Sequence, residues 1–163
     1  MIVDALVLAI WTGQRQGALL KLQWSAYDGR HIRLKQAKTG RRVSVLVSDE
    51  LRATIERLKS ENENRDVLST CILNNSFGKP WTSDGFRASW RKACSGVVEG
   101  LTFHDLRGTF IMMARRAGAS IDDIAEASGH SIKDVRSVLE THYLGHEAGR
   151  GDLVILKLEG KEK

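Results

Sequence analysis

The sequence has little cysteine and little proline: two cysteines and one proline in 163 residues. Cys71 and Cys94 are not spaced as a CxxC pair. They therefore give no disulfide framework, and a reducing cytoplasm is the expected compartment. The apolar run at residues 2–11 contains Asp4 and is too short to cross a membrane. Neither a G-x-S-x-G motif nor a P-loop occurs. The sequence therefore gives no support for a hydrolase with a catalytic triad or for a nucleoside triphosphatase.

The composition is that of a globular protein with an excess of basic residues. Apolar residues make up 42% of the chain and charged residues 28%, which suits one domain with its own core. The net charge of +5 and the pI of about 9.4 indicate, weakly, a polyanionic partner. Because Met1 already lies within an apolar helical pattern, we expect residues 1–163 to be a single domain cut from a longer chain.

Apolar residues at helical spacing, with capping residues before them, predict a mainly α-helical domain. In the first part of the chain, helices are predicted at residues 2–10, at 16–23, after Ser48, and after Thr82 or Ser83. These helices leave room for only a small sheet.

Three further helix starts share one pattern in the last third of the chain. Thr102, Ser120 and Ser131 are each followed three residues later by Asp, which matches the capping box. Gly118 and Gly129 fit helix ends, where a left-handed residue is common. The pattern therefore predicts three short helices joined by tight turns.

Two runs of alternating apolar and polar residues, 31–35 and 43–47, are separated by a turn that contains Gly40. Such a pair predicts a β-hairpin. Residues 67–73 are predicted as a further short strand. We therefore expect an α+β fold, mainly α, with a small antiparallel β-sheet.

Four side chains of the last third are suited to work on a phosphate. His104 and Arg107 are three apart, so they point from one face of a helix. His130 follows Gly129 in the tight turn between two predicted helices, and Tyr143, one of two tyrosines, stands at or just past the end of the last helix. A permanent cation, two imidazoles and a phenol can bind a phosphate, move a proton and supply a nucleophile.

The motifs resemble those of the catalytic domain of tyrosine recombinases, the phage-integrase family. The resemblance covers nearly the whole chain and rests on five motifs in the family's order: Thr12-Gly13-Gln14-Arg15, Lys38-Thr39-Gly40, His104-Asp105-Leu106-Arg107, Gly129-His130-Ser131 and Tyr143. It implies the tyrosine-recombinase catalytic-domain fold, and site-specific DNA breakage and rejoining without a cofactor or metal. Residues 1–163 would then be the C-terminal catalytic domain of a longer integrase, with the N-terminal DNA-binding domain absent.

The resemblance also implies partners and a setting. Double-stranded DNA would be the substrate, several protomers would assemble on it, as a tetramer at synapsis, and accessory DNA-bending proteins could assist. The chain would serve as the integrase of a phage, prophage or other mobile element, in the bacterial cytoplasm at the nucleoid. No membrane is involved in such a reaction.

The residue types explain how such a site would hold a phosphodiester. Arg15 and Arg107 would bind the non-bridging oxygens with permanently charged guanidinium groups. Preorganised charge of this kind is usually the largest catalytic contribution. His130 would donate a further hydrogen bond to the scissile phosphate.

The remaining three residues would carry out the bond exchange. Tyr143 would attack phosphorus, and His104 would assist removal of its proton. Lys38 would protonate the leaving 5′-oxygen. The resemblance implies a 3′-phosphotyrosine product, which keeps the bond energy so that rejoining needs no ATP.

Two features depart from the family's pattern. An acidic residue usually stands three positions after the first arginine, where this chain has Ala18, and the spacing from His130 to Tyr143 is a few residues longer than usual. Ala18 favours one alternative, a catalytically silent DNA-binding remnant of a prophage. A type IB topoisomerase, which shares this active-site plan, is a second alternative.

Taken one at a time, the six candidate residues could also be surface cations, helix caps or packing anchors. Their ordered occurrence favours the catalytic interpretation. The basic clusters Arg115-Arg116 and Arg87-x-x-x-Arg91-Lys92 could contact the DNA backbone or form a solvated face, because phosphate contacts carry no sequence signature.

Overall fold

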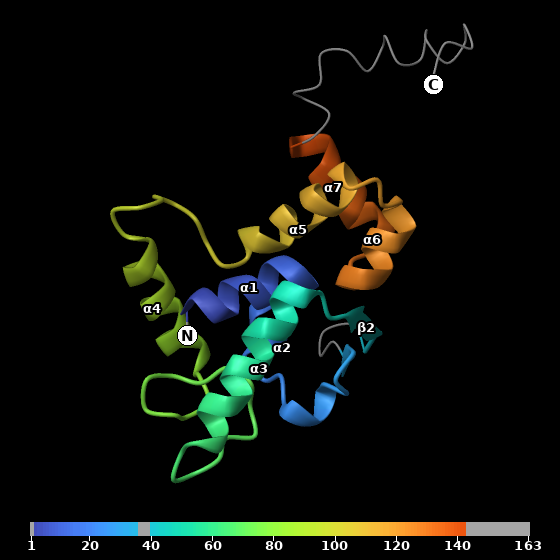
Figure 1. Cartoon of the computed structure of the whole chain (residues 1–163). Helices are drawn as coiled ribbons and strands as arrows, with labels where there is room; N and C mark the ends of the chain where they lie inside the picture. The colour runs from blue at the N-terminus through green and yellow to red at the C-terminus, as the bar shows by residue number, and fades with distance from the viewer. Residues whose placement is uncertain (1, 36–39, 143–163) are drawn as a thin grey trace, which may run out of the picture.

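The computed structural model describes residues 2–35 and 40–142, so the predicted site residues Lys38 and Tyr143 lie outside the described residues. Its elements are, in chain order, α1 (Ile2–Thr12), α2 (Gln16–Leu19), the short 3-10 helix η1 (Trp24–Ala26), β1 (His31–Lys35), β2 (Arg42–Leu46), α3 (Asp49–Glu63), α4 (Ser83–Cys94), α5 (Asp105–Arg116), α6 (Ile121–Ser128) and α7 (Ile132–His142) (Figure 1). The described chain is mainly helical and its two strands form one antiparallel sheet, which confirms the predicted fold class.

Helix α1 lies between α3 on one side and α5 on the other (Figure 1). Its residues Ala5 and Leu8 are fully buried, and they share a core with Leu51 and Ile55 of α3 and Phe86 of α4. A helix that is apolar on most of its faces is buried on several sides. The other elements of the first half of the chain therefore gather around α1.

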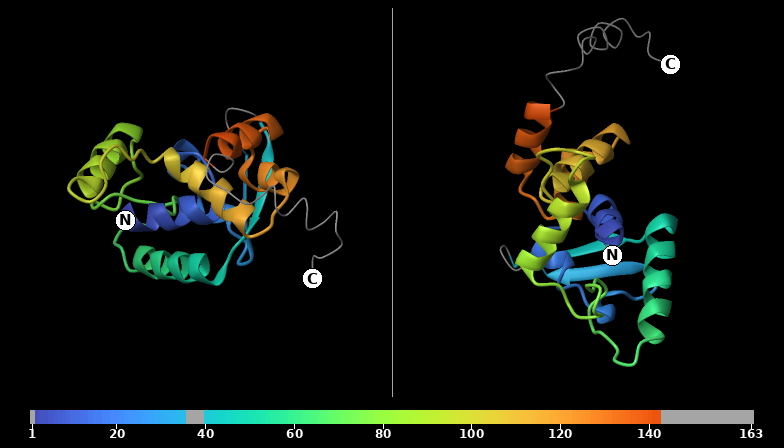
Figure 2. Two further views of the ribbon diagram at one scale, coloured as in Figure 1. Left: turned by 90° about the horizontal axis from the view of Figure 1, so that it is seen from above. Right: turned by 90° about the vertical axis from the view of Figure 1, so that its left-hand side faces the viewer.

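A second, smaller core joins the last three helices. Its buried residues are Ile111 from α5, Ile124 and Ala125 from α6, and Val135 and Leu139 from α7. Figure 2 shows these helices on one side of α1, with the hairpin and α3 on the other. The segments that carry Gly13, Arg107 and His130 meet through hydrogen bonds of Arg107.

The hairpin forms with the predicted register of buried and exposed residues. His31 pairs with Leu46 and Lys35 with Arg42. Ile32 and Val45, which pair with each other, point into the protein, as the alternating pattern requires. Strand β2 also packs against α6, so this packing ties the hairpin to the last three helices.

Most predicted helix starts are confirmed by their caps. The Ser48 hydroxyl accepts a hydrogen bond from the Leu51 N–H (3.3 Å), and Thr82 caps α4 in the same way. Ser120 and Asp123 form the complete reciprocal box. The capping box at Thr102 is half formed: the Thr102 N–H donates to the Asp105 carboxylate. The helix α5 begins only at Asp105, so His104 occupies the cap position in place of Thr102.

Two predicted elements differ from the structure. The prediction of a strand at residues 67–73 is wrong. The described backbone makes a single isolated bridge there, between Cys71 and Gln23. Within the described residues no strand pairs with this segment, and Val67 stays 80% exposed. The helix predicted at 16–23 ends at Leu19. The chain turns after this residue, so that Gln23 can pair with Cys71. Within residues 2–35 and 40–142, no helix is both long and apolar enough to span a bilayer.

Candidate active site

The turn after α1 is built so that Arg15 emerges beside α5. Gly13 has φ 61°, and a Cβ at this position would lie 2.5 Å from Cδ1 of Phe110, so the contact between α1 and α5 requires glycine. Gln14 is buried, and its Nε2 donates to the carbonyls of Thr12 and Ala127, both at 3.0 Å. These bonds hold the turn against the end of α6.

Arg107 is the buried centre of the arrangement, with 3% of its surface exposed. Its Nη1 donates to the carbonyl of Gly13 and to that of Ser128, the latter at 3.3 Å. Its Nη2 lies 2.8 Å from Nε2 of His130. The Nε atom is buried and has no hydrogen-bond partner among the described residues. One guanidinium therefore joins three segments and retains an unused donor.

The hydrogen bonds of His130 define its tautomer. The Ser128 hydroxyl donates to the carbonyl of Ile124 (2.6 Å), and Nδ1 of His130 lies 2.7 Å from the same hydroxyl oxygen. Because a hydroxyl has one proton to donate, Nδ1 carries the hydrogen and donates it to Ser128. The Nε2 lone pair then accepts from Arg107. His130 is thus inferred to be neutral in the free protein, with Nε2 facing the arginine.

The electrostatics agree with a neutral imidazole at His130. Burial, followed by the positive charges of Arg107 and Arg15, lowers the pKa of His130 to about 4. Burial, followed by the charge of Arg15, lowers the pKa of Arg107 to about 10, so the guanidinium stays charged at neutral pH. His104 also acts on His130. Four basic side chains from three separate segments of the chain therefore lie within electrostatic reach of His130 or Arg107.

A hollow of about 510 Å³ opens over this cluster, between α5 and α7. His104, Arg107 and His130 line it, together with Arg116. His104 is exposed at the start of α5. From the other side, Nη1 of Arg41 donates to the carbonyl of His130 (3.2 Å), so the hairpin reaches the same turn. The hollow is open, basic and bordered by α5, α7 and the Gly129–His130 turn.

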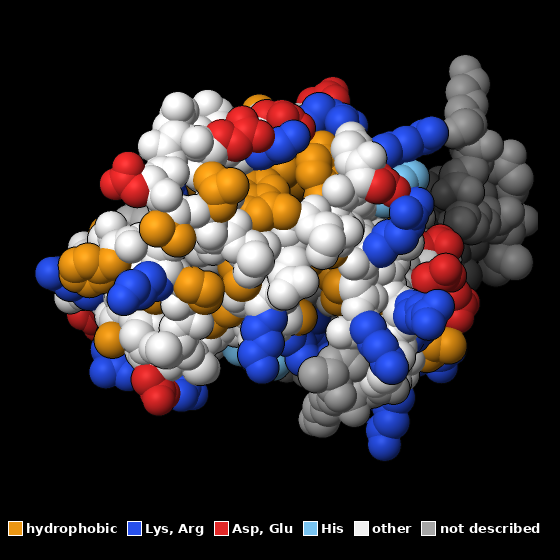
Figure 3. Space-filling model, turned by 90° about the horizontal axis from the view of Figure 1, so that it is seen from below, with side chains coloured by type: hydrophobic (Ala, Val, Ile, Leu, Met, Phe, Trp, Pro, Cys, Tyr) orange, Lys and Arg blue, Asp and Glu red, His pale blue; other side chains and the backbone are white. Residues whose placement is uncertain are grey.

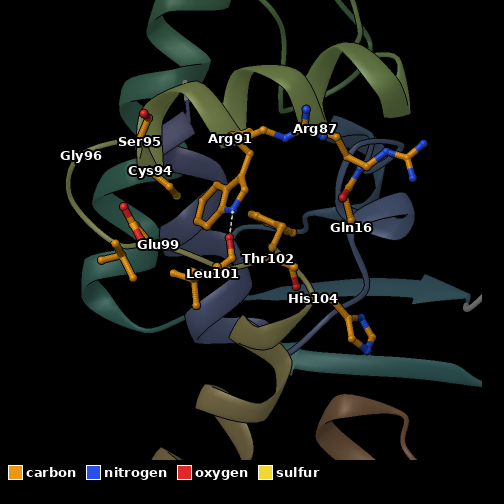
Figure 4. Close-up of a pocket in the computed structure, with 14 residues that line it drawn as sticks. Gln16, Arg87, Arg91, Cys94, Ser95, Gly96, Glu99, Leu101, Thr102 and His104 are labelled. Carbon is orange, nitrogen blue, oxygen red and sulfur yellow. Dashed lines mark hydrogen bonds between the residues drawn. The ribbon is translucent and has the colours of Figure 1, made fainter.

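A second hollow, of about 630 Å³, adjoins the first at His104, which lines both. Figure 4 shows it below α4, with Arg87 and Arg91 extending from that helix and Gln16 and His104 at one margin. Trp90 closes its floor by donating from Nε1 to the carbonyl of Leu101 (3.1 Å). The basic cluster predicted on α4 therefore borders the same cleft as the histidine.

The structure brings together Arg15, His104, Arg107 and His130 from among the six predicted residues. Lys38 and Tyr143 lie outside the described residues, although α7 runs as far as His142. The four described residues come from the α1–α2 turn, α5 and the α6–α7 turn, which meet through the hydrogen bonds of Arg107.

The chain matches the model of the Phage integrase family over residues 3–148. The chain belongs to the phage integrase family. It is 32% identical over 127 residues to the shufflon-specific DNA recombinase of Escherichia coli. That match covers 76% of this chain and 30% of the recombinase. The matched part of this chain therefore spans less than a third of the length of that recombinase.

Solved structures of the family share the fold. The XerA recombinase superposes with a TM-score of 0.71 at 19% identity, over 90% of this chain and 62% of that one. A lambda integrase tetramer bound to a Holliday junction matches with a TM-score of 0.65 at 25% identity, over 80% of this chain and 40% of that one. The fold of this chain thus corresponds to a known three-dimensional arrangement.

Two residues that support the site have no role in the sequence interpretation. Gln14 stands inside the first motif, where the sequence pattern gives its amide no role of its own. Ser128 stands four residues after Ile124, on the buried face of α6. A polar residue at a core position is the signal that could have identified Ser128, since such a group needs a hydrogen-bond partner.

Proposed function

We propose that this chain is the catalytic domain of a site-specific DNA recombinase, which cuts and rejoins DNA through a 3′-phosphotyrosine at Tyr143. The observation that supports this most is that Arg107 and His130 are hydrogen-bonded to each other in the lining of one open hollow, and that the charge of Arg15 acts on both of them. Two guanidinium groups beside an imidazole match the charge that gathers on phosphate oxygens in the transition state.

Arg107 would present one edge of its guanidinium to the scissile phosphate. Its Nη1 is committed to the carbonyls of Gly13 and Ser128, whereas Nε has no partner among the described residues. The Nε and Nη2 donors lie on one edge and can bind two oxygens in parallel. A phosphate oxygen would take the place of His130 as the acceptor for Nη2.

Arg15 would bind the same phosphate from the α1–α2 turn. His130 would then turn from acceptor to donor, because a nearby negative charge favours its protonated form. His104 would assist the proton of Tyr143, and Lys38 would protonate the leaving 5′-oxygen. Each of these roles follows the family's order of motifs, and Tyr143 follows directly on α7, which lines the hollow.

Double-stranded DNA is the proposed substrate, and self-association into a tetramer on DNA is the proposed assembly. The lambda integrase match is a tetramer on a Holliday junction. Lys and Arg side chains gather along the lower edge of the face in Figure 3, with histidine atoms visible between them. Accessory DNA-bending proteins would assist, and the reaction would take place in the bacterial cytoplasm at the nucleoid.

A catalytically silent DNA-binding domain is the second candidate. Ala18 lines a hollow of about 610 Å³ with Arg15, Lys21, Arg33 and Lys35, and no carboxylate is among its described lining residues. This hollow could bind phosphate whether or not cleavage occurs. The type IB topoisomerase alternative has less support, because the relatives and solved matches described above are recombinases and integrases.

A covalent trapping assay tests the proposed function. The protein is incubated with nicked duplex DNA from the element's own attachment site and analysed on a denaturing gel, beside Tyr143→Phe. A shifted band that the variant lacks is the expected result. A band that persists in Tyr143→Phe would show that the nucleophile is misassigned, and relaxation of supercoiled plasmid lacking the site would indicate a topoisomerase. DNA binding without any band in the full-length protein would favour the silent domain.

A further inference from the structure

Ser128 is the last residue of α6, two positions before His130, and it is completely buried. Its hydroxyl donates to the carbonyl of Ile124 (2.6 Å). The hydroxyl oxygen lies 2.7 Å from Nδ1 of His130 and 3.4 Å from the backbone nitrogen of the same residue. A hydroxyl has one hydrogen to donate and two lone pairs that accept. Because its hydrogen is directed at Ile124, the oxygen faces His130 as an acceptor.

The contact with Arg107 does not by itself orient the imidazole of His130. Nη2 of Arg107 lies 2.8 Å from Nε2 of the ring and 3.1 Å from Nδ1. A neutral imidazole accepts at one nitrogen and donates from the other, so either nitrogen could accept from the guanidinium. The Ser128 hydroxyl makes its ring contact at Nδ1. The serine, rather than the arginine, therefore distinguishes the two ring nitrogens.

The position of this acceptor is fixed by the backbone. The carbonyl of Ser128 accepts from Nη1 of Arg107 at 3.3 Å. Gly129 ends α6 in the left-handed conformation, with φ 67°, so the chain turns and the N–H of His130 points back to the Ser128 hydroxyl. Ser128 thus contacts Arg107 through its backbone and His130 through its side chain, and both of these residues line the hollow of the candidate site.

An acceptor at Nδ1 suits both protonation states of the ring. Nδ1 carries a hydrogen in the observed neutral tautomer, and both nitrogens carry one in the imidazolium. The hydrogen bond to Ser128 is therefore kept when His130 gains a proton, and only Nε2 changes from acceptor to donor. The ring does not have to rotate as a phosphate arrives, which is the preorganisation that stabilises a developing charge.

We propose that Ser128 is a positioning residue of the candidate site, whose hydroxyl oxygen holds the Nδ1–H of His130 so that Nε2 is the nitrogen presented to the scissile phosphate. This inference rests on the proposed DNA cleavage and deepens the description of the same site.

Loss of the acceptor leaves two states of the ring, and both bind the phosphate less well. In the neutral ring the hydrogen can move to Nε2 while Nδ1 accepts from Arg107, which is 3.1 Å away. That ring offers an uncharged hydrogen bond, and charge-assisted bonds are about twice as strong. The imidazolium would instead bury an Nδ1–H that has lost its acceptor in Ser128, which is costly.

The first measurement is the rate of covalent adduct formation in the full-length protein at saturating nicked DNA. Ser128→Ala should slow this rate about three- to tenfold, the effect of losing one hydrogen bond in the transition state. Affinity for DNA should stay unchanged, because contacts along the phosphate backbone dominate it. Ser128→Cys keeps the size of the side chain but replaces the oxygen by a weak acceptor, so it should be slowed to a similar extent.

Ser120→Ala is the matched control. It removes a serine hydroxyl from the other end of α6, where that hydroxyl caps the helix by accepting from the Asp123 N–H (3.1 Å). Removal of this cap should destabilise the helix while leaving the adduct rate unchanged. A rate in Ser128→Ala equal to or above that in Ser120→Ala would overturn the proposal. A normal rate in Ser128→Cys would also overturn it, because the serine would then serve only to fill space.

The second measurement is the tautomer of His130, which loss of helix stability alone would not change. NMR chemical shifts of the two ring nitrogens, recorded at neutral pH without DNA in protein with isotopically labelled histidine, report where the hydrogen lies. The hydrogen should be on Nδ1 in the unmodified chain and in Ser120→Ala, and should move towards Nε2 in Ser128→Ala and Ser128→Cys. Unchanged shifts in Ser128→Ala would refute the positioning role. If even the unmodified protein forms no adduct, the proposed cleavage fails, while the shifts still decide whether Ser128 holds Nδ1.

Discussion

Replacement of Arg107 by alanine should destabilise the protein as well as stop cleavage. The side chain is 3% exposed, and its Nη1 satisfies the carbonyls of Gly13 and Ser128, which belong to different segments. Leaving a buried acceptor without its donor costs about 1–3 kcal/mol for each group. Removal of a buried charge returns part of this, because the guanidinium no longer has to be desolvated. A net loss of about 2–3 kcal/mol is expected for the two carbonyls together.

The measurement is the thermal unfolding midpoint. For a chain of this size a loss of 2–3 kcal/mol lowers Tm by roughly 5–10 °C. Arg107→Lys keeps a charge but has no planar fork, so it should lie between alanine and the unmodified chain. Arg116→Ala, an exposed position at the end of the same helix, is the matched control and should shift Tm by less than about 2 °C.

The reasoning would be refuted if Arg107→Ala melted at the same temperature as Arg116→Ala. In that case the carbonyls of Gly13 and Ser128 would have found other donors, and the arginine would serve the phosphate alone. If the predicted shift is found, loss of cleavage in Arg107→Ala has to be measured below its unfolding range, because part of the loss comes from a displaced Gly13 turn.

Two further predictions concern the same turn and its histidine. Gly13→Ala should lower Tm more than Gly40→Ala. Both positions have positive φ, but the added Cβ would meet Phe110 at position 13 and nothing within 4 Å at position 40. Equal shifts of Tm would show that Phe110 moves freely. The free energy of unfolding should fall as pH drops from about 6.5 to about 4, by up to about 3 kcal/mol, because the pKa of His130 is lowered to about 4 in the folded state. The unfolded chain therefore binds the proton first, and the stabilisation is complete above pH 6.5. Denaturant titrations across this range should show the slope in the unmodified chain and a smaller one in His130→Asn; an equal slope would assign it to another group.

The local patterns of the sequence were sufficient for the elements near the site. Alternation at 31–35 and 43–47 produced the observed hairpin, and the Ser120–Asp123 box appears in full. Both are local in sequence: the cap forms between residues three apart, and the two strands of the hairpin are joined by a single turn. The strand predicted at 67–73 failed because an extended segment becomes a strand only if another strand pairs with it, and pairing is a long-range property.

The sequence by itself determined the family, the order of the five motifs and the types of residue at each. Tertiary structure decided which atoms meet: Arg107 is buried, and it shares its donors between Gly13, Ser128 and His130. The reason is physical. A sequence pattern identifies an arginine at the start of a helix, but the carbonyls that its guanidinium reaches depend on which other segments fold against that helix.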